Sequence, residues 1–382
     1  MTTMIGSDEA SRLLGISKPT LYAYVSRGLI DRQTAVDGRT SLYPRDQIEE
    51  LAGRGRSKPP VERPSIDVRI GSSITLLDDT RLRYRGHDVA ELARTTSFER
   101  VAELLWTGAL PDAEPTWRVD RDGLERCVDV VRAADGSGVD ALTLSAVALA
   151  AHDDGVGTGA DAARALLSIA PTVLGGPRGG STAARVTKAY VRRPAPELVA
   201  AIDGALVLLA DHELATSTLA VRVACSVRTR AFSALGAGLA AVGGPLHSGA
   251  SAETAELIAR AESDGASATV ASYLDAGRML PGFGHSVYRR GDPRFAPLLD
   301  AIRAVPGAGP TTDAVDGVVA EAGRRLAHLP NVDLALGALL HAGGLPHTAP
   351  LFAVARIAGW GAHYDEEAAE RPVRFRGLTR LR

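Results

Sequence analysis

The chain has 382 residues, of which 45% are hydrophobic and 23% charged, and its 43 basic and 45 acidic residues give a formal net charge of −2. This composition excludes a disordered chain, and the charge balance excludes a globally basic nucleic-acid-binding protein. No apolar run reaches the roughly 18 residues of a membrane span, and the first residues do not resemble a secretory signal. The two cysteines, Cys127 and Cys225, are far apart in the sequence. This spacing predicts neither a disulfide framework nor a zinc site and favours a cytoplasmic protein.

Residues 1–52 are predicted to form a small unit of their own. Ser7 and Ser17 can each cap a short helix that a glycine ends. Residues 34–43 are typical of a hairpin with a tight Asp-Gly turn, and a third helix is predicted over residues 45–51. This order of elements resembles the winged helix-turn-helix of the MerR and excisionase type.

Residues 53–65 are rich in glycine, proline and charged residues, which predicts a linker. After the linker, apolar residues recur at three- and four-residue spacing almost to the C-terminus, a pattern that indicates amphipathic helices. Strand signals are confined to residues 68–77. The fold class is therefore predicted to be mainly α. The segments with the clearest helical spacing are 141–151, 162–169, 197–209, 216–227, 252–261 and 315–327.

Three breaks between predicted helices carry titratable residues, and loops between rigid elements are where binding and catalytic residues concentrate. The first break, GPLHSGA, contains His247 just before a predicted helix start. The helix dipole there disfavours imidazolium, and a neutral imidazole can donate a hydrogen bond to a carbonyl that is becoming an enolate. The alternative is a histidine that only caps backbone groups of the loop.

The second break, PGFGHSVYRRGDPR, contains His285 between residues that allow close backbone approach to a ligand; an exposed turn histidine is the alternative. Arg294 is predicted in the first turn of a helix, where a cation opposes the macrodipole. Either an anionic ligand or an ion pair with Asp292 would explain it. The third break, PNVD, contains Asp333, which is either a helix N-cap or a carboxylate made more basic by desolvation at the edge of an apolar pocket.

The segment Asp211-His212-Glu213 alternates acid, imidazole and acid between two predicted helices. Such an alternation can indicate a metal site. However, neither a cysteine partner nor a second histidine stands at ligand spacing, so we predict no metal ion.

Together these segments resemble the citrate synthase family over about residues 66–380. The family's motifs occur in the family's order: RYRGHD, ADHE followed by ST, GPLHSGA, PGFGHSVYRRGDPR, PNVD, LFAVAR and ERP. The resemblance implies a large helical domain, residues 66–248 and 346–382, and a small helical domain, residues 249–345. Both follow the winged helix-turn-helix-like unit.

The resemblance also implies an acyltransferase that condenses acetyl-CoA with oxaloacetate to citrate and CoA. No metal and no cofactor is implied beyond the CoA thioester, which is a substrate. Asp333 would remove a proton from the acetyl group, His247 would stabilise the enolate, and His285 would protonate the ketone of oxaloacetate. The residues implied to hold oxaloacetate are His212, Arg294, Arg356 and, across a homodimer, Arg371.

The sequence departs from the family pattern beside the catalytic positions. Ser248 stands where glycine is common, Ser286 follows His285 where arginine or alanine is usual, and Leu-Ala-Leu-Gly follows Asp333. Two alternatives therefore stay open. The first is a 2-methylcitrate synthase that uses propionyl-CoA, since one methylene changes binding by only about 1–3 kcal/mol.

The second alternative is a DNA-binding regulator whose synthase-like body senses a metabolite. Residues 1–52 contain six basic and seven acidic residues, a net charge of −1, which gives little phosphate neutralisation. The basic residues that could cluster on one face are Arg12, Lys18, Arg27 and Arg39. Two further assignments are open: Arg374 and Arg376 compete with Arg371, and candidates for the CoA phosphates are Arg324, Arg325 and His328.

Overall fold

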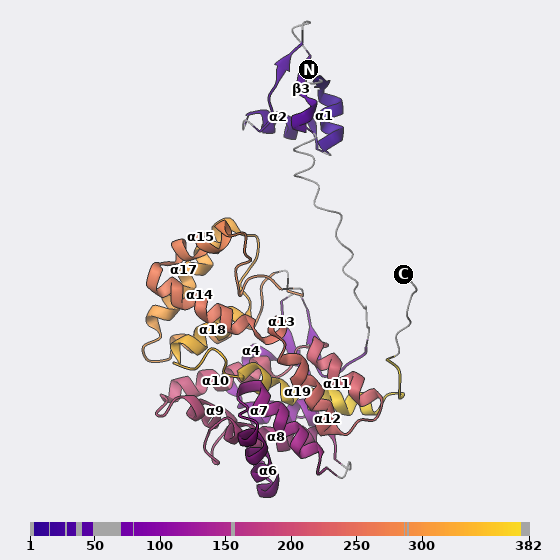
Figure 1. Cartoon of the computed structure of the whole chain (residues 1–382), viewed down its shortest axis with the longest axis vertical. Helices are drawn as coiled ribbons and strands as arrows, with labels where there is room; N and C mark the ends of the chain where they lie inside the picture. Colours follow the sequence, from indigo (N-terminus) through magenta and orange to yellow (C-terminus); the bar gives the residue numbers. More distant parts are fainter. Residues whose placement is uncertain are drawn as a thin grey trace. The chain divides into compact units, whose positions relative to one another are not determined.

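The computed structural model describes residues 4–14, 16–26, 29–35, 40–48, 70–78, 80–153, 157–285, 287–288 and 290–375. The chain divides into two compact units, Met1–Ile70 and Gly71–Arg382, which we describe separately (Figure 1). Among the described residues, no helix has both the length and the apolar character that crossing a bilayer requires.

The described part of the first unit is a three-stranded antiparallel sheet, in the order β1-β3-β2, with two helices before β2 and a helical stretch at residues 45–48. Ile5, Leu21 and Tyr43 are buried in a small core of its own. The first two predicted helices and both strands of the predicted hairpin are present, whereas β1 was not predicted. Residues 45–48 of the predicted third helix are helical, and its remaining residues lie outside the described ranges. The predicted Asp-Gly turn lies outside the described residues. The elements are β1 (Met4–Gly6), α1 (Ser7–Leu14), α2 (Lys18–Ser26), β2 (Gln33–Thr34) and β3 (Ser41–Pro44).

The second unit begins with a small antiparallel sheet in the order β4-β5-β6 and continues as helices. The prediction of a mainly α fold is confirmed. Several helices begin where a side chain caps them as expected, for example at Ser97, which accepts from the Arg100 N–H, and at Thr158, which forms a capping box with Asp161. The strands are β4 (Thr75–Leu77), β5 (Leu82–Tyr84) and β6 (His87–Asp88).

The helices of this unit fall into two groups (Figure 1). The first group is α4 (Val89–Thr95), α5 (Phe98–Thr107), α6 (Arg121–Ala133), α7 (Gly138–Ala150), α8 (Gly159–Val173), α9 (Thr182–Tyr190), α10 (Pro196–Leu209), α11 (Thr216–Ser226), α12 (Ala231–Val242), α13 (Pro245–Ser248) and α19 (Leu351–Ala368). The second is α14 (Ala250–Asp264), α15 (Ala266–Asp275), α16 (Phe295–Arg303), α17 (Gly309–Arg325) and α18 (Val332–Ala342). The second group corresponds to the predicted small domain. Its division from the large domain stays a prediction, because the whole of Gly71–Arg382 forms one compact unit.

Helix α19 lies in the middle of the first group and packs against α8, α10, α11 and α12. Its small residues allow this close approach. A side chain at Gly359 would collide with Asp211, and the Gly359 N–H donates to the carbonyl of Ala210 at 3.1 Å. Trp360 beside it is fully buried. This packing holds α19 against the loop that follows α10.

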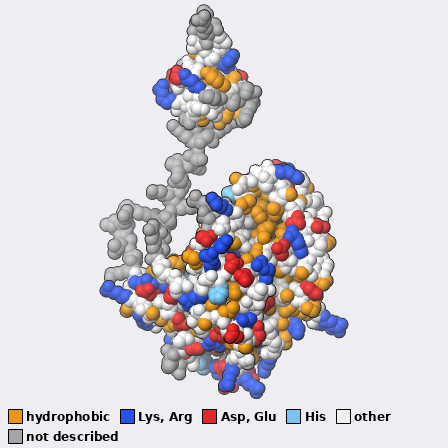
Figure 2. Space-filling view, turned by 180° about the vertical axis from the view of Figure 1, so that it is seen from behind, with side chains coloured by type: hydrophobic (Ala, Val, Ile, Leu, Met, Phe, Trp, Pro, Cys, Tyr) orange, Lys and Arg blue, Asp and Glu red, His pale blue; other side chains and the backbone are white. Residues whose placement is uncertain are grey.

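On the face shown in Figure 2, acidic and basic side chains of the second unit are interspersed. This arrangement agrees with the nearly balanced charge of the chain.

Candidate active site

A cavity of about 500 Å³ lies where the loop after α10 meets α13, the loop between α15 and α16, α18 and α19. It contains six of the seven predicted site residues, although they come from distant parts of the sequence. The seventh, Arg371, is exposed and does not line the cavity. The residues that line it are His212, Glu213, Leu214, Ala215, Thr216, His247, His285, Val287, Arg294, Val332, Asp333, Phe352 and Arg356.

Asp333 lies in the first turn of α18 and lines the cavity. The N-cap of this helix is Asn331, whose side-chain oxygen accepts from the Asp333 N–H at 3.0 Å. The interpretation of Asp333 as the cap is therefore wrong. Burial raises the pKa of its carboxyl group, and Arg294 opposes this shift only in part. Because capping does not occupy it, this more basic carboxylate is available to accept a proton from a ligand.

His285 lies in a loop whose backbone is held in place by hydrogen bonds. The Gly284 N–H donates to Leu329 O at 2.9 Å, and the Asn331 side chain donates to Gly284 O at 2.7 Å. The Nδ1 atom of His285 faces the N–H groups of Val287 and Tyr288 at 3.1 and 3.3 Å. Nδ1 is thus an acceptor, which places the proton of the neutral ring on Nε2. Burial and then Arg294 lower the pKa of this histidine.

His212 packs edge-on against His285, with ring centroids 5.3 Å apart. Its Nε2 lies 3.0 Å from the hydroxyl of Tyr288, which fixes the orientation of the ring. Burial, followed by the nearby charges of Arg294 and Arg356, lowers the pKa of His212 well below its ordinary value. The ring is therefore neutral at physiological pH and serves as a hydrogen-bonding group rather than a charge.

His247 lies within the short helix α13, not in the loop before α14 as predicted, because Pro245 begins a separate helical turn. Its ring is 5.7 Å from that of Phe352, edge to face. The predicted neutral state agrees with a lowered pKa, but the main cause is burial, followed by Arg356, rather than a helix dipole. The cavity thus holds three histidines that favour the neutral form.

Arg294 is almost fully buried and forms a bidentate ion pair with Asp292, with Nε–Oδ1 and Nη2–Oδ2 distances of 2.9 and 2.8 Å. Helix α16 begins at Phe295, so Arg294 is its N-cap and not a residue of its first turn. Asp292 also accepts from the Val332 N–H at 3.0 Å. The pair with Asp292 explains the cation at this helix start and ties it to the beginning of α18.

Arg356 differs from Arg294 because its charge has little compensation. The residue is 1% exposed, and its Nε and Nη1 atoms are buried without a hydrogen-bond partner. Its guanidinium stacks 4.6 Å from the centre of the Phe352 ring, and burial lowers its pKa although Asp211 opposes this. A buried guanidinium with free donors is costly unless an anion pairs with it. Arg356 therefore marks the cavity as a site for an anion.

Sequence reasoning missed Phe352, which touches both His247 and Arg356. Its position four residues before Arg356 on one helix face was the available signal. Asp211 was considered only as a metal ligand. It is instead buried against Thr75 and His363, and among the described residues no group of acidic, histidine or cysteine side chains is arranged to hold a metal.

The other open assignments concern arginines away from the cavity. Arg374 pairs with the buried Glu367, whereas Arg376 lies outside the described residues. Arg324 and Arg325 pair with Glu321 at 2.6 and 2.5 Å. The ion pair of Arg374 engages one of the two competitors of Arg371, and the assignment of the contact across subunits to Arg371 stays a prediction.

Comparisons with known proteins show the family of the chain. A family model described as "Citrate synthase, C-terminal domain" matches residues 68–376. The 2-methylcitrate synthase of Mycobacterium tuberculosis is 29% identical over 356 residues (80% of this chain, 88% of the relative), and citrate synthase 1 of that organism is 32% identical over 357 residues (77% and 80%). The crystal structure of citrate synthase from Pyrobaculum aerophilum matches with a TM-score of 0.70 and 25% identity, covering 82% of this chain and 89% of that chain. The chain belongs to the citrate synthase family.

Proposed function

We propose that this protein is a citrate synthase, an acyltransferase that condenses acetyl-CoA with oxaloacetate to give citrate and CoA. The observation that carries the proposal is the buried, unpaired guanidinium of Arg356 in the cavity that also holds Arg294 and Asp333. Arg294 and Arg356 match a substrate with two carboxylates, and the buried carboxylate of Asp333 matches a partner substrate with an acidic carbon.

Oxaloacetate binds first in this account. Arg356 directs its free Nε and Nη1 donors at one carboxylate, and Arg294, held rigid by Asp292, contacts the other. His212 donates from its neutral ring without adding charge. Arginine suits this task because its planar fork matches carboxylate geometry. The bound dianion then compensates the buried charge of Arg356, whereas the charge of Arg294 is already paired with Asp292.

Proton removal from acetyl-CoA follows. Asp333 accepts a methyl proton, and its raised pKa makes it a stronger base than an exposed aspartate. The enolate oxygen accepts a hydrogen bond from neutral His247, whose orientation Phe352 fixes. No metal ion and no cofactor besides the CoA thioester takes part in this proposal.

Bond formation and hydrolysis complete the reaction. The enolate carbon attacks the ketone of oxaloacetate, and His285 gives its Nε2 proton to the ketone oxygen as the bond forms. The Nδ1 contacts with two backbone N–H groups keep the proton on the side available to substrate. Water then cleaves the citryl thioester and releases CoA.

The choice between the two acyl-CoA substrates is tested by measuring thiol release in the presence of oxaloacetate, from acetyl-CoA and from propionyl-CoA in parallel. We expect a higher kcat/KM for acetyl-CoA, by roughly 10-fold or more, which corresponds to one methylene in an apolar pocket. The relative from Mycobacterium tuberculosis named 2-methylcitrate synthase supports the second candidate, propionyl-CoA. A higher kcat/KM for propionyl-CoA would select that candidate and reject the first.

Arg294 has a second role in stability, which its replacement should expose. In Arg294→Leu, we expect weaker oxaloacetate binding together with a loss of about 3–5 kcal/mol in the free energy of unfolding, because the buried Asp292 loses its partner. Denaturant unfolding and calorimetric titration measure the two effects. The double variant Asp292→Asn/Arg294→Leu should recover stability but not affinity. Unchanged oxaloacetate affinity in Arg294→Leu would contradict the role of Arg294 in binding.

We also propose a homodimer in which Arg371 of the partner subunit reaches the oxaloacetate site. The exposure of Arg371, outside the cavity of its own chain, supports this assignment. DNA binding is not proposed. Of the basic residues considered for it, Lys18 pairs with Asp8 at 2.6 Å, and Arg27 and Arg39 lie outside the described residues.

A further inference from the structure

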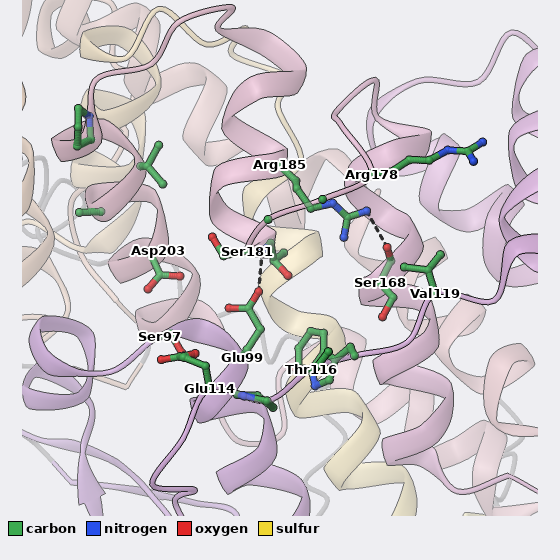
Figure 3. A pocket seen from close by; sticks show the side chains of 18 residues that line it. Ser97, Glu99, Glu114, Thr116, Val119, Ser168, Arg178, Ser181, Arg185 and Asp203 are labelled. Atoms are coloured by element: carbon green, nitrogen blue, oxygen red, sulfur yellow. Dashed lines mark hydrogen bonds between the residues drawn. The ribbon is translucent and has the colours of Figure 1, made fainter.

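A second cavity, of about 710 Å³, lies between α5, the start of α9 and α10, and it shares no lining residue with the active-site cavity (Figure 3). Its volume is typical of a site for a small organic molecule. One side carries the carboxylates of Glu99, Glu114 and Asp203, and the other carries Arg178 and Arg185. The proposed reaction uses none of these groups.

Glu99 has an unsatisfied oxygen although it is only 8% exposed. Its Oε1 accepts from the Thr182 N–H at 2.6 Å, whereas its Oε2 is buried without a hydrogen-bond partner. In Figure 3 this second oxygen points toward the side of the cavity where Asp203 lies. A buried carboxylate oxygen without a donor is rare in folded proteins, and a ligand that donates to it is a direct explanation.

The other two carboxylates come from different elements. Asp203 on α10 accepts only a long bond, 3.3 Å, from the Phe98 N–H, and Glu114 accepts from the Ser97 hydroxyl at 2.6 Å. Within the described ranges, none of the three carboxylates forms an ion pair with a basic side chain. Burial and the charges of Glu99 and Glu114 raise the pKa of Asp203 to about 7.

Arg185 attracts Glu99 electrostatically, but within the described residues neither arginine of the cavity forms an ion pair with this acidic side. Arg185 on α9 donates to the carbonyls of Pro177 and Ser168 at 2.9 and 2.8 Å and to Thr172 at 2.9 Å, which directs its guanidinium away from Glu99. Arg178 is exposed, and in Figure 3 it lies on the side opposite Asp203. The acidic side is thus complementary to a positive group supplied from outside.

We propose that this cavity binds a small organic cation whose primary ammonium group is held by Glu99, Asp203 and Glu114. An ammonium group carries three N–H donors, which suit acceptors that approach from three separate elements. The described carboxylates are not arranged as a metal site. The half-buried Trp117 adds an aromatic face at the cavity wall for the organic part of the ligand.

The test uses the full chain and 1,4-diaminobutane as the probe, titrated calorimetrically at about pH 8 with Glu99→Gln beside it. We expect binding by the parent protein and about 10-fold or greater loss in Glu99→Gln, because the charge-assisted bond is removed. Glu125→Gln, at an exposed position on α6, is the matched control and should bind like the parent. Tetramethylammonium has the same charge per nitrogen but no N–H donor, and it should bind more weakly.

Asp203→Asn keeps the test decisive if Glu99→Gln does not fold. The folded-state pKa of Asp203 is raised, so the carboxyl stabilises the fold at low pH and this contribution is lost as pH rises toward about 7. Asp203→Asn should therefore raise the melting temperature more at about pH 8 than at about pH 5, and it should weaken diamine binding. For the parent, diamine binding should strengthen between these two pH values as Asp203 ionises.

Three results would overturn the proposal. The first is the absence of diamine binding by the folded parent protein at about 10 mM, a concentration that detects even very weak sites. The second is equal binding of diamine by the parent, Glu99→Gln and Asp203→Asn. The third is equal binding of tetramethylammonium and the diamine, which would show that the N–H donors are not recognised.

Discussion

Replacing Asp333 with asparagine should lower the turnover of acetyl-CoA by roughly 10²–10⁴-fold, the usual contribution of a general base. Oxaloacetate binding should stay nearly unchanged, because Asp333 acts on the other substrate and the two arginines remain. The fold should also be retained, because Asn331 and not Asp333 caps α18. Thiol release measures turnover, and calorimetric titration of oxaloacetate measures binding.

The control for this change is Asp313→Asn, the same replacement at an exposed position on α17. We expect parental turnover and parental oxaloacetate affinity for this control. If Asp333→Asn kept the turnover of the parent, the carboxylate would not be the base. If it lost oxaloacetate binding as well as turnover, Asp333 would act in binding rather than in proton removal.

Replacing Arg356 with methionine should weaken oxaloacetate binding by about 2–5 kcal/mol, which is roughly 30-fold or more. Stability without substrate should not fall, because the change removes a buried charge whose donors have no partner and keeps the packing on Phe352. One variant should therefore show weaker oxaloacetate binding without a loss of stability. Calorimetric titration and denaturant unfolding of the same preparation measure the two effects.

Arg222→Met is the matched comparison, since Arg222 is also fully buried. This arginine pairs with Glu366 and Glu367 at 2.8 and 3.0 Å, so its loss should cost about 3–5 kcal/mol of unfolding free energy. If Arg356→Met were destabilised as strongly as Arg222→Met, the guanidinium of Arg356 would be paired within the protein. The inference of an anion site from Arg356 would then fail.

The sequence predicts the fold class and the cavity better than it predicts the state of each residue. Helical spacing and glycine- and proline-rich breaks are local signals, and they identified the three segments that carry His247, His285 and Asp333, although only His285 lies in a loop. Motif order brought Arg294, the N-cap of α16, and Arg356, on α19, into the same prediction. The predictions of helices and breaks hold because each depends on residues that are close in the chain.

The features that the sequence does not determine depend on contacts between segments that are distant in the chain. From the sequence PNVD, only Asp333 was considered as a cap of α18, and only the folded loop shows that Asn331 caps it instead. The ion pair of Arg294 was one of two explanations, whereas Arg356 could not be distinguished as unpaired before its surroundings were known. The acidic cavity has no motif, because Glu99, Glu114 and Asp203 meet only through packing of α5 and α10.

The most direct test of the account is thiol release from acetyl-CoA by the full chain, with and without oxaloacetate. We predict release that depends on oxaloacetate and is nearly absent in Asp333→Asn, since the base works only in a site that the bound dianion completes. Citrate should form in proportion to the thiol. Release that is independent of oxaloacetate, or no release from either acetyl-CoA or propionyl-CoA by the folded protein, would contradict the proposed reaction.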